Sequence, residues 1–192
     1  MLNLPNQLTL LRLLLSVVLF CFIATGWYWT SFGLFVVAAG TDWFDGYFAR
    51  KLGLVTTLGR ILDPFADKVI VCGTFIYLVS TPETFAVPGG LRAWMVVVIV
   101  GRELLVTALR SFLEERGSDY SAQMSGKLKM VCQCIAAGTG LFYFGYMGPH
   151  PADPSHPCWL WLTLVLSTWA ATVLTAYSGV VYVWVAVKLL RE

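Results

Sequence analysis

The stretch TDWFDGYFARKLGLVTTLGRILDPFADK, residues 41–68, carries four aspartates, two arginines and two lysines. It belongs to a chain of 192 residues, of which 58% are hydrophobic and only 12% are charged. Soluble proteins are typically about 45–50% apolar and about 25% charged. We therefore expect an integral membrane protein in which this stretch concentrates the charge.

Six apolar segments are long enough to cross a bilayer, and polar or turn-forming segments separate them. We expect spans near residues 7–27, 31–50, 61–80, 91–114, 125–147 and 159–188. Nothing in the sequence suggests a separate soluble domain, so residues 1–192 are expected to form a single membrane domain. The predicted fold is an all-α integral membrane protein with six transmembrane helices.

The placement of Lys and Arg in short loops predicts which side of the membrane each loop faces. The second connection, the fourth connection and the C-terminus carry Arg50, Lys51, Arg60, Arg110, Arg116, Lys127, Lys129, Lys188 and Arg191. The remaining connections offer only Arg92, and aromatic residues that favour the membrane interface gather there: Trp27, Tyr28, Trp29, Trp94, Trp159 and Trp161. We therefore expect a multi-pass protein of the inner (cytoplasmic) membrane with both termini cytoplasmic.

The second and third spans form a hairpin whose two arms carry all four aspartates. At about 1.5 Å per residue, these aspartates lie roughly 5 to 12 Å from the cytoplasmic end of their helices. The spacing is i, i+3, i+4, i+7 for Asp42, Asp45, Gly46 and Ala49, and steps of four for Gly59, Asp63 and Asp67. Each arm thus presents one face of carboxylates bordered by small residues.

Four carboxylates that converge in a partly dehydrated place need compensating positive charge. Carboxylate oxygens suit hard cations such as Mg²⁺ or Mn²⁺, and four carboxylates can hold two of them. A pair of such cations is a common clamp for phosphoryl transfer, and Arg50 can pair with a phosphate group. The sequence therefore predicts an active site near the cytoplasmic side that acts on a phosphoester.

Simpler explanations exist for parts of this pattern. Asp63 precedes Pro64, as an N-cap residue precedes a proline in the first helical turn. Arg50, Lys51 and Arg60 also suit cytoplasmic anchors. Carboxylates within a membrane occur in proton relays and cation transporters too, so spacing alone leaves a transport protein or a non-catalytic metal-binding protein open.

The aspartate stretch resembles the signature of the CDP-alcohol phosphotransferase family, D-x2-D-G-x2-A-R-x8-G-x3-D-x3-D. Every specified position and both gaps match, at Asp42, Asp45, Gly46, Ala49, Arg50, Gly59, Asp63 and Asp67. The resemblance implies that the four aspartates bind two divalent cations and that Asp67 is also the general base. It further implies a homodimer and a CDP-linked donor that contacts Gly46, Ala49, Arg50, Thr56 and Gly59.

The segment LPNQLTLLR, residues 4–12, resembles a second family segment, P-N-x2-T-x2-R. This resemblance implies that Asn6 and Thr9 lie beside the nucleotide of the donor. The alternative is that both residues only cap the first helix.

Two later segments bear on the acceptor alcohol. GRELLVTALRSFLEERG, residues 101–117, and GKLKM, residues 126–130, resemble segments of bacterial family members that use a glycerol phosphate, although Met130 replaces a threonine. Arg110, Lys127 and Lys129 are cations that suit an acceptor with its own phosphate, and cytoplasmic anchoring is the alternative. We therefore expect transfer of a phosphatidyl group from CDP-diacylglycerol to sn-glycerol 3-phosphate, with release of CMP. Inositol phosphate, serine and phosphatidylglycerol stay open as acceptors.

Arg102 lies some eight residues before Arg110 in the fourth span, so it needs a carboxylate or a polar cavity as partner. Its neighbour Glu103 is not an assured partner, because successive side chains point about 100° apart on a helix.

Overall fold

The computed structural model describes residues 4–52, 57–115, 124–148 and 158–191. Within these ranges, the side chains of residues 4–6, 8, 41–52, 57–61, 63, 113–115, 124–127 and 189–191 lie outside the description. The described residues form helices and no strand: α1 (Leu4–Ala24), α2 (Tyr28–Leu52), α3 (Thr57–Ser80), α4 (Pro82–Phe85), α5 (Ala93–Glu115), α6 (Met124–Met147) and α7 (Cys158–Arg191). The all-α prediction is confirmed for this part of the chain.

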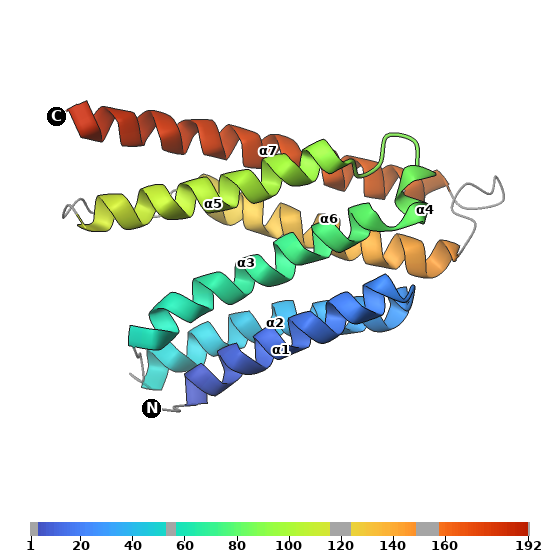
Figure 1. Cartoon of the computed structure of the whole chain (residues 1–192), viewed down its shortest axis with the longest axis horizontal. Coiled ribbons are helices and arrows are strands. Elements are labelled where there is room, and N and C mark those ends of the chain that lie inside the picture. Colours follow the sequence, from blue (N-terminus) through green and yellow to red (C-terminus); the bar gives the residue numbers. More distant parts are fainter. Residues whose placement is uncertain (1–3, 53–56, 116–123, 149–157, 192) are drawn as a thin grey trace.

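The long helices run back and forth along one bundle, and both ends of the chain lie at the same end of it (Figure 1). α1 packs on α2 and α3, while α5 and α6 pack on α7. α3 also contacts α5 and α6, and α2 contacts α6, which joins the two groups. We call the end that holds the two chain ends the terminal end and the other end the α4 end.

The predicted spans agree with the six long helices to within four residues. The largest difference is the start of α3, which begins at Thr57 rather than near residue 61, and the break between α1 and α2 is shifted by three residues. α1 ends at Ala24 and α2 begins at Tyr28, whereas the sequence predicts a break between residues 27 and 31. Gly26 has φ of 78°, a conformation that favours glycine, and the Trp27 N–H donates to the Phe22 carbonyl at 2.9 Å. This turn ends α1 earlier than the hydrophobic pattern alone predicts.

Apolar side chains fill the interior of the bundle and also cover much of its outside. Leu19, Phe75 and Leu141 are fully buried. Val97 and Val180 are 69% and 70% exposed, which suits a surface that faces lipid. Among the described residues, two helical stretches are long and apolar enough to cross a membrane, Leu128–Met147 and Cys158–Lys188.

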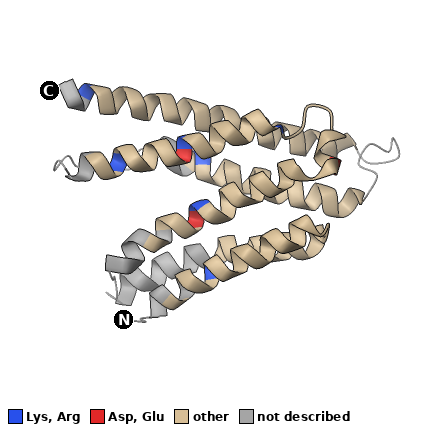
Figure 2. Cartoon of the chain, in the orientation of Figure 1, with Lys and Arg blue, Asp and Glu red and all other residues tan. Residues whose placement is uncertain are grey.

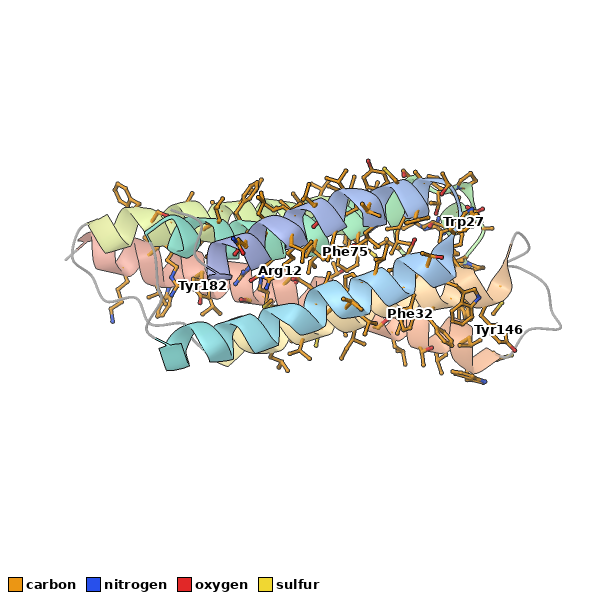
Figure 3. The ribbon with its side chains drawn as sticks, turned by 90° about the horizontal axis from the view of Figure 1, so that it is seen from below. Arg12, Trp27, Phe32, Phe75, Tyr146 and Tyr182 are labelled. Atoms are coloured by element: carbon orange, nitrogen blue, oxygen red, sulfur yellow. The ribbon has the colours of Figure 1, made fainter. Side chains whose placement is uncertain are left out.

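Aromatic side chains gather at the α4 end. Trp27, Phe32 and Tyr146 lie there, whereas Arg12 and Tyr182 lie towards the terminal end (Figure 3). The sequence predicts that Tyr28 lies at the membrane interface, but this residue is only 6% exposed and lies inside the bundle. Its hydroxyl donates to Glu83 Oε2 at 3.2 Å, so this ring ties α2 to α4 inside the bundle.

Candidate active site

The backbone places the predicted aspartates on two helices near the terminal end. Asp42 and Asp45 lie in α2, and Asp63 and Asp67 lie in α3. Of the four side chains, the structure describes that of Asp67. The structure does not describe the side chains of Asp42, Asp45, Asp63, Ala49 and Arg50 or the surroundings of Gly46 and Gly59, and Thr56 lies outside the described residues. Convergence of the four carboxylates therefore stays a prediction.

The capping explanations for Asp63, Asn6 and Thr9 are wrong. α3 begins at Thr57 and contains Pro64 in its interior, so Asp63 lies within the helix rather than before it. Asn6 and Thr9 lie within α1, which already includes Leu4. Residues inside a helix do not serve as its N-cap, which leaves these positions in need of another explanation.

An ion pair joins α1 to the aspartate helix. Arg12 Nη1 donates to Asp67 Oδ1 at 2.9 Å, and the Arg12 side chain is 3% exposed. On α1, Arg12 is one member of a buried stripe at helical spacing, together with Thr9, Ser16, Leu19 and Ile23. The sequence prediction gave Arg12 no role, although it is the arginine of the matched segment P-N-x2-T-x2-R and a charged residue in an apolar span is a signal of a functional site.

A cavity of about 140 Å³ lies beside Asp67. Its wall comes from α3, α5 and α6 and consists of Pro64, Asp67, Lys68, Val71, Cys72, Glu103, Lys129, Met130 and Gln133. The volume is below the roughly 300–1,000 Å³ of pockets for drug-sized ligands, so it suits a small polar molecule rather than an acyl chain. The cavity brings the predicted base Asp67 and the predicted acceptor residue Lys129 to one place.

Glu103 is the centre of a buried polar cluster on the part of the cavity wall that α5 and α6 form. Its Oε1 accepts hydrogen bonds from Lys129 Nζ, from Gln133 Nε2 at 3.3 Å and from Arg102 Nη1 at 3.3 Å. Gln133 Nε2 also donates to Thr175 Oγ1 at 2.9 Å, which extends the cluster to α7. Arg102 and Lys129 together outweigh the single carboxylate, so the cluster carries a net positive charge when all three groups are ionised.

Arg102 is anchored between α5 and α7. Its Nη2 donates to Ser178 Oγ at 2.6 Å, and its guanidinium lies over the ring of Tyr182 at 5.2 Å. A Cβ at Gly179 would lie 2.9 Å from Arg102 Cγ, so the glycine makes room for the arginine side chain. The predicted need for a polar partner is thus met, and Glu103 is one of the partners despite its adjacent position in sequence.

The three predicted acceptor cations differ in their surroundings. Lys129 is 6% exposed and pairs with Glu103, whereas Arg110 is an exposed residue of α5. Lys127 lies in α6, and its side chain is outside the described set. Met130, which departs from the family pattern, lines the cavity beside Lys129. The structure therefore brings Lys129, but not Arg110, to the cavity that Asp67 borders.

Most described charged residues lie in the half of the bundle that holds the terminal end (Figure 2). Among the side chains that the structure describes, no group of three or more His, Cys, Asp or Glu residues is close enough to hold a metal ion. The oxygen-only donor set of the four aspartates fits Mg²⁺ or Mn²⁺, and Asp67 is 25% exposed, which leaves its carboxylate accessible to a ligand.

Comparisons with known proteins agree with the signature. The model of the CDP-alcohol phosphatidyltransferase family matches residues 2–173. The chain is 35% identical to a CDP-diacylglycerol–glycerol-3-phosphate 3-phosphatidyltransferase of Bacillus subtilis, with 98% of both chains covered. It is 30% identical to the enzyme of that name from Cereibacter sphaeroides, with 99% of this chain and 98% of the relative covered. It is also 36% identical to a probable phosphatidylglycerophosphate synthase of Mycobacterium tuberculosis, with 94% of this chain and 80% of the relative covered. The match of the family model over most of the chain, together with the aspartate signature on α2 and α3, shows that the protein belongs to the CDP-alcohol phosphatidyltransferase family.

Proposed function

We propose that this protein transfers the phosphatidyl group of CDP-diacylglycerol to sn-glycerol 3-phosphate, which gives phosphatidylglycerophosphate and CMP. The similar proteins named above carry this donor and this acceptor in their names. The observation that supports the acceptor most directly is the cavity that both Asp67 and Lys129 line. A carboxylate that can take a proton and a cation that can hold a phosphate therefore border one small space.

The donor is assigned to the α1, α2 and α3 side of the bundle. Family membership supports contact of the cytidine diphosphate with Asn6, Thr9, Gly46, Ala49, Arg50, Thr56 and Gly59. Thr9 is 2% exposed on the same helix face as Arg12, so it faces the interior near Asp67. The acyl chains of the donor would stay in the lipid, which explains why the protein needs a membrane-embedded bundle.

Asp42, Asp45, Asp63 and Asp67 would hold two divalent cations, Mg²⁺ or Mn²⁺. When bound, such cations neutralise the diphosphate and the charge that develops on departing CMP. Arg12 holds the Asp67 carboxylate in place from α1 through its 2.9 Å contact. A carboxylate held in this way is positioned before substrates arrive, which lowers the cost of ordering it during the reaction.

In the transfer step, the primary hydroxyl oxygen of the acceptor attacks the phosphorus that bears the diacylglycerol. The new P–O bond forms as the P–O bond to CMP breaks, and the Asp67 carboxylate takes the hydroxyl proton. Lys129 binds the phosphate of the acceptor in the cavity. Lys127 is a proposed contributor, as is Arg110, which would attract the acceptor from its exposed position on α5 rather than from the cavity wall. The Lys129 ammonium has three N–H donors, so its bond to Glu103 leaves others for a phosphate.

The arrangement in the membrane follows from the same proposal. We assign the six long helices as transmembrane spans of one domain over residues 1–192 in the inner (cytoplasmic) membrane. The active site and both termini lie on the cytoplasmic side, which agrees with the position of both chain ends at one end of the bundle (Figure 1). The protein is also proposed to act as a homodimer in contact with membrane lipid.

A CMP-release assay with the purified protein in detergent micelles tests the function. CDP-diacylglycerol is supplied with Mg²⁺ or Mn²⁺ and, in separate reactions, with sn-glycerol 3-phosphate, inositol phosphate, serine or phosphatidylglycerol. We expect release with sn-glycerol 3-phosphate and a lipid product that carries two phosphates. Release with another acceptor alone would refute the acceptor, and no release with any acceptor would refute the enzyme and favour a metal-binding or transport role.

A further inference from the structure

Glu103 has one carboxylate oxygen that the buried cluster does not use. All of its hydrogen bonds within the described part of the chain reach Oε1, from Lys129, Arg102 and Gln133. Its Oε2 accepts no hydrogen bond from these residues. Unlike Arg102 Nε, which is buried and has no hydrogen-bond partner in the described part of the protein, Oε2 is not fully enclosed there. Because Glu103 is only 7% exposed and lines the 140 Å³ cavity, the open space that Oε2 meets is this cavity.

The three donors on Oε1 have a consequence for the other oxygen. They come from α5 and α6, and Gln133 is itself held by Thr175 of α7. A carboxylate clamped on one side cannot turn freely, so Oε2 is a fixed hydrogen-bond acceptor on the cavity wall. Such a group repels a phosphate but accepts strongly from a hydroxyl.

Three side chains on the cavity wall can therefore make three different interactions. Asp67 on α3 can accept the proton of a reacting hydroxyl, Lys129 on α6 can bind a phosphate, and Glu103 on α5 can accept from a second hydroxyl. A glycerol phosphate carries these three groups: the primary hydroxyl that reacts, the phosphate, and a secondary hydroxyl between them. A simple hydroxyalkyl phosphate lacks the middle group.

We propose that Glu103 determines acceptor specificity by accepting a hydrogen bond through Oε2 from the non-reacting secondary hydroxyl of the acceptor. This inference rests on the proposed function and adds a residue that recognises the secondary hydroxyl of the acceptor. Arg102 and Gln133 act as positioning residues, because they hold the carboxylate of Glu103 without meeting that hydroxyl.

The experiment compares sn-glycerol 3-phosphate with 3-hydroxypropyl phosphate, which keeps the primary hydroxyl and the phosphate but lacks the secondary hydroxyl. The readout is the ratio of kcat/KM for the two acceptors in CMP release. A hydrogen bond to a charged acceptor predicts that the wild-type protein prefers the glycerol compound by about 10- to 100-fold. Glu103→Gln should shrink this ratio to a few fold, because an amide oxygen accepts less strongly than a carboxylate.

The matched control is Glu83→Gln, which makes the same substitution on α4 at the other end of the bundle and should leave the ratio unchanged. A purely structural role of Glu103, as the counterion of Lys129 and Arg102, predicts that Glu103→Gln slows both acceptors equally and keeps the ratio. That result would overturn the proposal. A wild-type ratio near one would overturn it without any variant.

If Glu103→Gln does not fold, Glu103→Asp tests the same ratio. It retains the charge that Lys129 and Arg102 need but withdraws the carboxylate by one methylene, so the ratio should fall while the protein remains folded. An unchanged ratio in Glu103→Asp would contradict the inference. Absence of CMP release from the wild-type protein with sn-glycerol 3-phosphate is a different outcome, because it refutes the proposed function itself.

Discussion

Arg12 Nη1 lies 2.9 Å from Asp67 Oδ1, and this contact joins α1 to α3 next to the cavity that Asp67 borders. The two residues are 55 positions apart in sequence. Arg12 is almost fully buried, whereas the Asp67 side chain is 25% exposed. The Arg12 side chain is thus enclosed by the protein, while the Asp67 carboxylate is accessible to ligands.

Removal of the Arg12 guanidinium is expected to affect both stability and turnover. Arg12→Met leaves the Asp67 carboxylate without its buried partner, so we expect a loss of about 1–3 kcal/mol of unfolding free energy. Turnover should fall at least about tenfold, because the carboxylate is less well positioned. Arg12→Lys keeps the charge and should retain more of both properties. Thermal unfolding in detergent micelles and CMP release measure the two effects.

Arg92→Met is the matched control for Arg12→Met. Arg92 lies at the α4 end, and its guanidinium donates to the backbone carbonyls of Phe85 and Val87. The control should keep the turnover of the wild-type protein. Equal losses of turnover in the two variants would show that Arg12 has no particular relation to the active site.

Asp67→Asn tests the role of Asp67 as the base. The amide has nearly the same shape and can still accept from Arg12, but it does not take a proton at neutral pH. We expect turnover to fall by about 10³-fold or more, while the protein stays folded and still binds CDP-diacylglycerol. Turnover at the wild-type level would refute the assignment of the base.

Metal removal tests the proposed cation site as a whole. Chelation should stop CMP release, and Mg²⁺ or Mn²⁺ added in excess of the chelator should restore it, because the four aspartates repel one another without a cation. The metal content of the chelated protein is measured in parallel. Full activity of protein shown to be free of divalent cations would exclude the two-metal proposal.

Lys129→Gln tests the phosphate-binding role in the acceptor site. Loss of the ammonium should raise the KM for sn-glycerol 3-phosphate by about tenfold or more, while the KM for CDP-diacylglycerol changes little. Lys188→Gln, on an exposed position of α7, is the matched control and should leave both KM values unchanged. An equal rise in both KM values for Lys129→Gln would indicate a general structural defect instead.

The sequence predicted α6 and α7 well because each contains a long, nearly continuous apolar stretch, Leu128–Met147 and Cys158–Lys188. α6 spans Met124–Met147 and α7 spans Cys158–Arg191, close to the expected 125–147 and 159–188. The short α4 was not predicted, because one helical turn between Pro82 and Phe85 leaves no periodic pattern. α1 ends early because Gly26 has a positive φ. The apolar pattern continues into the aromatic residues that follow Gly26, so the pattern alone did not indicate this end.

The site was predicted only as far as local spacing reaches. The aspartate signature lies within one hairpin, so its spacing could be read directly from residues 41–68. The pair of Glu103 with Lys129 joins residues 26 positions apart on different helices, and that of Arg12 with Asp67 spans 55. Helical periodicity carries no information about which helices become neighbours, so these contacts required the structure.

Gly179→Ala should weaken the cluster around Glu103 without touching a charged residue. The added Cβ would lie 2.9 Å from Arg102 Cγ, which is part of the side chain's anchored stem. Arg102 would have to move away from Ser178 and the Tyr182 ring, and we expect a loss of about 1–3 kcal/mol of unfolding free energy. Gly33→Ala is the control, because nothing lies within 4 Å of its added Cβ. Alanine also favours helix more than glycine does, so the control should be neutral or slightly stabilising in thermal unfolding. Equal stability of the two variants would mean that α7 does not hold Arg102 in the way that its contacts indicate.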